Sequence, residues 1–190
     1  MTATTNKIRS RAGFSLTEML LTVLIMSVAL VGITTGIATI QRSYRKITRK
    51  SNAMALISTL TTAMGADLKY ATDVRTDEDG VVEAFYSTKR NVLMEYGEEE
   101  DDDGKYLTID YLDVENGKTT ASTPLVTRSM YADDLTVEMT EPLTYVRDEN
   151  GNGLFTYEIS VLRNGAGSDE NALISQNFSV RPFALSERGR

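Results

Sequence analysis

The residues Met19–Gln41, MLLTVLIMSVALVGITTGIATIQ, decide the fold, because these 23 consecutive residues contain no charge. As an α-helix the stretch would be about 34 Å long at about 1.5 Å per residue, enough to cross the hydrocarbon core of a bilayer. It is too long for the apolar part of an ordinary signal peptide, and no Ala-x-Ala-like cleavage site closes it before Arg42. The stretch therefore predicts a membrane-spanning helix.

Basic residues flank this stretch on both sides, three before it and five after it. An excess of Lys and Arg marks the cytoplasmic side of a span, so the charge rule alone leaves the orientation open. The five that follow could bind anionic headgroups, pair with acidic neighbours, or form a solvated helix face. The basic residues are Lys7, Arg9 and Arg11, then Arg42, Arg45, Lys46, Arg49 and Lys50.

The composition of the 190-residue chain excludes several classes of function. Residues 1–50 carry a net charge of +7 and residues 51–190 carry −14. Binding to nucleic acid needs clustered Lys and Arg to neutralise phosphates, so direct contact of the acidic part with nucleic acid is not expected. The chain has no His and no Cys, which removes the commonest general base, the usual zinc ligands and thiol chemistry. No phosphate-binding glycine loop is present. We expect neither catalysis nor a bound cofactor.

Apolar residues continue beyond the uncharged stretch at helical spacing. No proline interrupts residues 14–68, so one helix of about 50 residues is predicted, with an amphipathic second half. Its apolar stripe is expected to pack against a sheet. The stripe consists of Ile40, Tyr44, Ile47 and Met54, followed by Ile57, Leu60, Met64 and Leu68.

The rest of the chain alternates between β-favouring segments and turn residues. The predicted turns are Asp79-Gly80, Asn116-Gly117, Asn150-Gly151 and Asn164-Gly165. A long helix followed by an antiparallel sheet is an α+β plan. The predicted strands are Val81–Ser87, Asn91–Tyr96, Lys105–Asp113, Leu125–Met130, Leu135–Thr140, Leu154–Arg163 and Leu173–Arg181.

The sequence Arg11–Leu20, RAGFSLTEML, resembles the cleavage signal of type IV pilins and type II secretion pseudopilins. The shared features are a short basic leader, Gly13, Phe14 and an acid, Glu18, five residues into the mature chain. The resemblance implies cleavage between Gly13 and Phe14 by a prepilin peptidase, and N-methylation of Phe14. It also implies that Glu18 pairs with the N-terminal amine of a neighbouring subunit. A carboxylate at the margin of a span usually has such a partner, although Glu18 could instead lie at headgroup level.

This resemblance implies a pilin-like organisation. Residues 1–13 would be the leader, 14–41 the transmembrane and assembly half of the helix, 42–68 its amphipathic half, and 69–190 an acidic, β-rich extracytoplasmic head. The protein would be a single-pass membrane protein with a cytoplasmic N-terminus, and would join a surface filament after assembly. Leu60–Ala71 is similar to the region after the helix of minor pseudopilins, which favours a low-abundance subunit.

The implied partners are other pilin-like subunits, the prepilin peptidase, a membrane platform protein and an assembly ATPase. The second hypothesis is a membrane-anchored extracellular binding module that does not polymerise. The two share the anchor and differ in whether copies of the chain associate.

Two further patterns have a functional and a structural interpretation. Gly32 and Gly36 form a Gly-x-x-x-Gly motif, which lets membrane helices approach closely, although glycine is common in such helices. Residues 98–103 are six consecutive acids. They fit a solvated hairpin loop, and their alternate members also match a calcium loop in part. The calcium candidates are Glu99, Asp101, Asp103 and Asp110.

Overall fold

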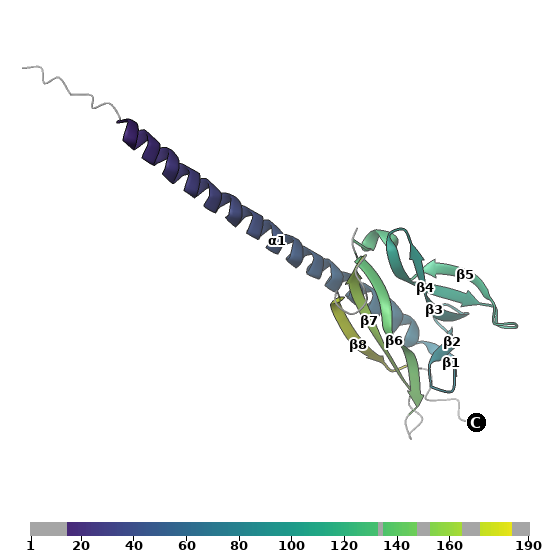
Figure 1. Ribbon diagram of the computed structural model, residues 1–190. Helices are drawn as coiled ribbons and strands as arrows, with labels where there is room; N and C mark the ends of the chain where they lie inside the picture. The colour runs from purple at the N-terminus through teal and green to yellow at the C-terminus, as the bar shows by residue number, and fades with distance from the viewer. Residues whose placement is uncertain (1–14, 133–134, 148–152, 165–171, 184–190) are drawn as a thin grey trace, which may run out of the picture. The chain divides into compact units, whose positions relative to one another are not determined.

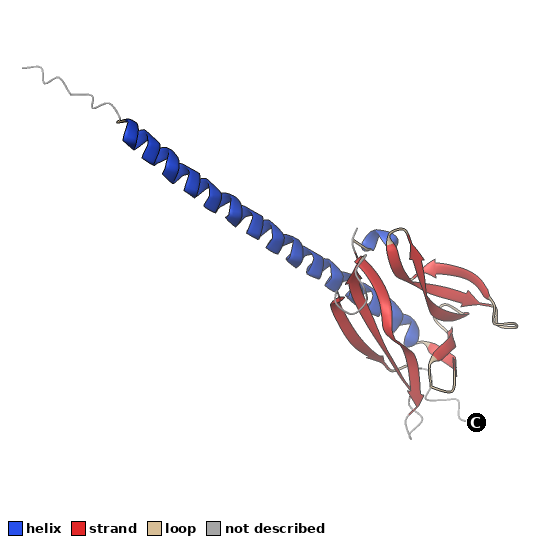
Figure 2. Cartoon of the chain, in the orientation of Figure 1, coloured by secondary structure: helices blue, strands red, loops and turns tan. Residues whose placement is uncertain are grey.

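The computed structural model describes residues 15–132, 135–147, 153–164 and 172–183, and the chain divides into two compact units, Met1–Lys46 and Ile47–Arg190 (Figure 1). All described strands belong to the second unit (Figure 2). In chain order the elements are α1 (Leu16–Leu68), β1 (Ala71–Thr76), β2 (Val82–Ser87), β3 (Val92–Asp101), β4 (Gly104–Leu112), β5 (Thr119–Pro124), the 3-10 helix η1 (Arg128–Met130), β6 (Leu135–Arg147), β7 (Gly153–Arg163) and β8 (Ala172–Val180).

Helix α1 confirms the prediction of one long N-terminal helix. It ends at Leu68, where the Tyr70 N–H turns back to the Asp67 carbonyl at 3.1 Å and the chain enters β1. The side chains that α1 buries in the second unit lie three and four residues apart, as helix packing requires. Ile47 and Met54 are exposed, so the buried stripe begins later than the sequence predicted. The buried apolar residues are Ala53, Leu56, Ile57, Leu60, Met64 and Leu68.

The first sheet is an antiparallel meander in the order β1-β2-β3-β4-β5. Its inner face contributes the fully buried Phe85, Met94 and Leu107 to the core. The strand predicted at Leu125–Met130 is wrong, because β5 ends at Pro124 and a 3-10 turn follows. Strands β1 and β5 were not predicted. The pairing of β1 with β2 has register shifts, and β5 is exposed at every residue. Neither strand shows the alternation of apolar and polar residues from which a strand is predicted.

The second sheet has the antiparallel order β6-β7-β8. Its central strand β7 buries Phe155, Ile159 and Val161 in the same hydrophobic core as α1 and the first sheet. The sheets meet where the Lys105 N–H donates to Thr136 Oγ1 at 2.8 Å. The second unit therefore packs one helical stripe against two antiparallel sheets, where the sequence indicated one sheet. The α+β class is confirmed.

Two of the predicted turns are present in the first sheet. Gly80, between β1 and β2, has φ = +82°, and Gly117, between β4 and β5, has φ = +66°. Only glycine adopts such values without strain, which explains the Asp-Gly and Asn-Gly pairs there. The turns predicted at Asn150-Gly151 and Asn164-Gly165 fall wholly or partly outside the described residues.

Candidate membrane-spanning and assembly segment

The first part of α1 exposes an apolar surface that the described chain does not cover. Its most apolar 18 residues are 0% buried by the described chain. Leu24, Ile25 and Val31 are each about 60% exposed or more. Soluble monomers rarely leave so large a contiguous apolar surface in water. This part of the helix has the length and the composition to cross a membrane, and it needs lipid or other apolar helices around it.

Hydroxyl side chains inside this segment are satisfied by the helix itself. Each donates a hydrogen bond to the carbonyl oxygen four residues earlier, at 2.7–3.0 Å. A hydroxyl paired in this way adds little cost to burial in lipid, because no donor is left without a partner. The residues are Thr22, Ser27, Thr34, Thr35 and Thr39.

Glu18 and Ser15 form a reciprocal cap at the start of α1. Glu18 Oε2 accepts hydrogen bonds from the Ser15 N–H at 3.0 Å and the Ser15 hydroxyl at 3.2 Å, while the Glu18 N–H donates to Ser15 Oγ at 3.3 Å. This is the capping-box arrangement, and an acid in the first turn also suits the helix dipole. Among the described residues, no bond to Glu18 Oε1 is present, so one carboxylate oxygen remains for another donor. The Ser-x-x-Glu spacing was visible in the sequence, although the role of Ser15 was not predicted.

The other predicted assembly residues are placed as follows. Gly13 and Phe14 lie outside the described residues. Gly32 and Gly36 lie one turn apart on α1, and a Cβ added at either would meet nothing within 4 Å. No contact within the described chain requires glycine at these positions. The Gly-x-x-x-Gly interpretation as a helix-packing surface stays a prediction.

The four calcium candidates are not gathered into a loop. Glu99 Oε2 accepts the Tyr106 hydroxyl at 2.8 Å, and Asp101 forms an ion pair with Arg128. Asp110 lies six residues along β4 from Gly104, or about 20 Å at about 3.4 Å per residue. Among the described residues, no group of three or more acidic side chains could hold a metal ion. The structure therefore gives no support to calcium binding by Glu99, Asp101, Asp103 and Asp110.

An ion pair with a fully buried carboxylate joins the end of α1 to the turn between β2 and β3. Arg90 donates from Nε to Asp67 Oδ1 at 2.9 Å, and its Nη2 lies 2.9 Å from Asp67 Oδ2. The Asp67 side chain is fully buried, and its hydrogen bond to Arg90 raises the pKa of the guanidinium. Lys89 approaches the same carboxylate less closely, at 3.9 Å. The sequence did not predict this pair because its members lie 23 residues apart, on different elements.

Comparison with protein-family models, with curated proteins and with solved structures gives no match to this chain. Its fold class and its apolar segment are therefore established from its own residues. They are an α+β fold and an N-terminal helix suited to anchoring in a membrane.

Proposed function

We propose that this protein is a structural subunit, of low abundance, of a type IV pilus or a type II secretion-like pseudopilus. The uncovered apolar surface at the start of α1 carries the proposal, because no described part of the chain buries it. The Gly13-Phe14 junction lies before that segment, so cleavage there would leave the anchor on the mature protein. A secretory signal peptide would instead be removed together with its apolar part.

In this proposal the chain is inserted with its N-terminus in the cytoplasm and its acidic second unit outside. The prepilin peptidase removes residues 1–13, and Phe14 becomes the methylated first residue. A platform protein and an assembly ATPase then move the apolar helix from lipid into the filament, where neighbouring helices replace lipid as its surroundings. The work comes from that ATPase, and this chain supplies the packing surfaces.

The geometry at Glu18 supports a role in assembly. Its Oε2 caps its own helix, while Oε1 is left for the Phe14 amine of a neighbouring subunit. A charge in the apolar core of a filament is costly unless it is paired. The Glu18 carboxylate and the neighbour's Phe14 amine would therefore favour the alignment of neighbouring helices in which these two charges meet. The cap holds the carboxylate at the helix start before a neighbour arrives.

Recovery of the chain from the cell surface tests the proposed function. We expect the processed protein in filaments sheared from the host surface, and its loss from that fraction when the assembly ATPase is deleted. The matched control is the membrane fraction, which should keep the processed chain in both strains. A non-polymerising anchored module would remain in the membrane in both, and that result would contradict the proposal.

A further inference from the structure

A groove in the second unit lies between the end of α1 and strand β8. Its volume is about 430 Å³. Two cations, Lys69 and Arg181, line it, together with the aromatic rings of Phe178 and Phe183. None of the described residues that line it is acidic. Phe183 is 67% exposed, and its ring lies 6.0 Å from that of Tyr70. The groove thus combines positive charge with an exposed aromatic surface.

The two cations of the groove have no counter-ion in the part of the chain that the structure describes. Within the described part of the chain, neither the Lys69 ammonium nor the Arg181 guanidinium forms an ion pair or a side-chain hydrogen bond. This is notable in a region that carries a net charge of −14 over residues 51–190. Two unpaired cations beside an aromatic ring favour a ligand that is both anionic and partly apolar.

The acidic run 98–103, at the end of β3 and in the turn that follows, has the opposite character. Of its acids, Glu98, Glu99 and Asp101 are bound within the chain, to the Met139 N–H, the Tyr106 hydroxyl and Arg128. Glu100 and Asp102 are exposed, and no hydrogen bond or ion pair of their carboxylates occurs among the described residues.

An exposed apolar side chain accompanies these free acids. Met130 is 46% exposed and belongs to the short helix η1, whose first residue, Arg128, binds Asp101. We call Glu100, Asp102 and Met130 the acidic tip. Like the groove, it combines charges with an exposed apolar side chain, and its charges have the opposite sign.

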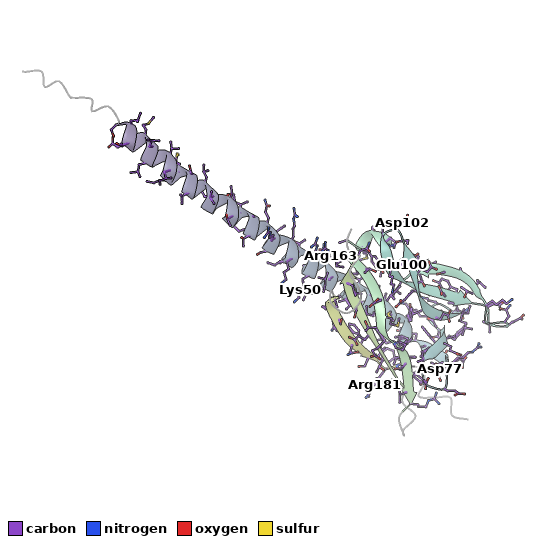
Figure 3. All side chains as sticks on the ribbon, in the orientation of Figure 1. Lys50, Asp77, Glu100, Asp102, Arg163 and Arg181 are labelled. Atoms are coloured by element: carbon purple, nitrogen blue, oxygen red, sulfur yellow. The ribbon has the colours of Figure 1, made fainter. Side chains whose placement is uncertain are left out.

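The groove and the acidic tip lie at opposite ends of the second unit. Val180, which lines the groove, pairs with Phe155 near the start of β7. Asn164, just past the end of β7, donates to the Asp103 carbonyl at the tip at 3.1 Å. The nine residues from Phe155 to Asn164 span about 30 Å at about 3.4 Å per residue. In Figure 3, Arg181 lies toward one end of the second unit, and Glu100 and Asp102 lie toward the other.

We propose that the acidic tip of one copy docks into the groove of a second copy, with Glu100 and Asp102 facing Lys69 and Arg181. Met130 then contacts Phe183, since a thioether packs well on an aromatic ring. Complementary surfaces at opposite ends of one unit give a head-to-tail contact, which repeats along a polymer and does not close a dimer. The inference deepens the proposed function and rests on it, because the filament brings the copies together.

The absence of cysteine makes this contact testable in the full chain, since only introduced thiols can react. Two differently tagged copies, Met130→Cys and Ser179→Cys, are expressed together and treated with a short bismaleimide. Both positions are exposed, and both leave the four charges intact. We expect a cross-linked dimer that carries both tags. In the matched control, Glu115→Cys replaces Met130→Cys, because Glu115 is an exposed acid in the β4–β5 turn, and its yield should stay at background.

Charge reversal separates electrostatic docking from chance proximity. The Lys69→Glu and Arg181→Glu substitutions, made together in the Ser179→Cys copy, should lower the yield of cross-linked dimer at least about fivefold. A fivefold loss corresponds to the contribution of one exposed ion pair. Adding Glu100→Lys with Asp102→Lys to the Met130→Cys copy should restore the yield. A yield equal to the Glu115→Cys control, or one that reversal does not change, would overturn the docking proposal. Surface filaments without the cross-link would overturn it and leave the proposed function standing. Loss of both processing and surface filaments would overturn the proposed function itself.

Discussion

Glu18→Ala is expected to abolish incorporation of the chain into surface filaments while leaving membrane insertion and cleavage intact. The Phe14 amine of a neighbouring subunit would lose its counter-charge in apolar surroundings, and an unpaired charge there is strongly destabilising. We expect at least about a hundredfold less protein in the sheared fraction, in line with that penalty. Insertion should not suffer, because the substitution makes the span more apolar. The measurement compares sheared and membrane fractions in cells without a wild-type copy.

Two control variants separate pairing between subunits from helix capping. Ser15→Ala removes the reciprocal cap at a cost of about 1 kcal/mol and should still assemble. Glu18→Gln keeps an oxygen that can cap the helix but removes the charge, so it should fail as Glu18→Ala does. Normal surface recovery of Glu18→Ala would show that this carboxylate has no part in assembly. If the single substitution Ser15→Ala also prevented incorporation into filaments, the loss of incorporation would be assigned to the helix cap.

Arg90→Met is expected to destabilise the second unit by about 3–5 kcal/mol, because it leaves the Asp67 carboxylate buried without its partner. The two members of the pair are not equivalent, since the Arg90 side chain is 35% exposed and Asp67 is 0% exposed. Arginine can therefore turn to water when Asp67 is replaced, whereas the carboxylate cannot. Asp67→Asn should cost less than Arg90→Met.

The control for this prediction is Lys89→Met, whose ammonium lies 3.9 Å from the same carboxylate and whose side chain is 49% exposed. It should change the free energy of unfolding by no more than about 1 kcal/mol, as for exposed ion pairs. Urea denaturation of the purified chain in detergent, followed by circular dichroism of the β signal, measures all three variants. An Arg90→Met variant as stable as Lys89→Met would show that the buried pair does not hold the end of α1.

The fold was predictable wherever one segment carries its own pattern. The uncharged run and the absence of proline located α1, and alternation located β2, β4 and β7 close to their observed bounds. Strand β5, TTASTP, is exposed throughout and forms by pairing with β4, so its own residues carry no apolar signal. Leu125 and Val126 are buried without being in a strand, which made the predicted strand at Leu125–Met130 wrong. Burial alone does not identify backbone conformation.

Among the candidate sites too, those formed by neighbouring residues could be predicted, and those formed by residues far apart in the sequence could not. Glu18 was identified because its motif is local, and its cap with Ser15 spans only three residues. The Asp67–Arg90 pair and the groove at Lys69 and Arg181 join residues far apart in the sequence. The pair depends on how α1 packs against the turn between β2 and β3, and the groove on how α1 packs against β7 and β8. Periodicity specifies neither arrangement. The acidic run suggested calcium, whereas the structure shows three of its members bound within the chain.

The intact mass of the mature protein, purified from the membranes of its own host, shows whether the chain is processed as a pilin-like subunit. We expect a chain that begins at Phe14, lacks residues 1–13 and carries one added methyl group on its N-terminal amine. Deletion of the prepilin peptidase should restore the full-length, unmethylated mass in the same membrane fraction. An uncut chain as the stable membrane form in a host with an active prepilin peptidase would contradict the assignment to a pilin-like filament.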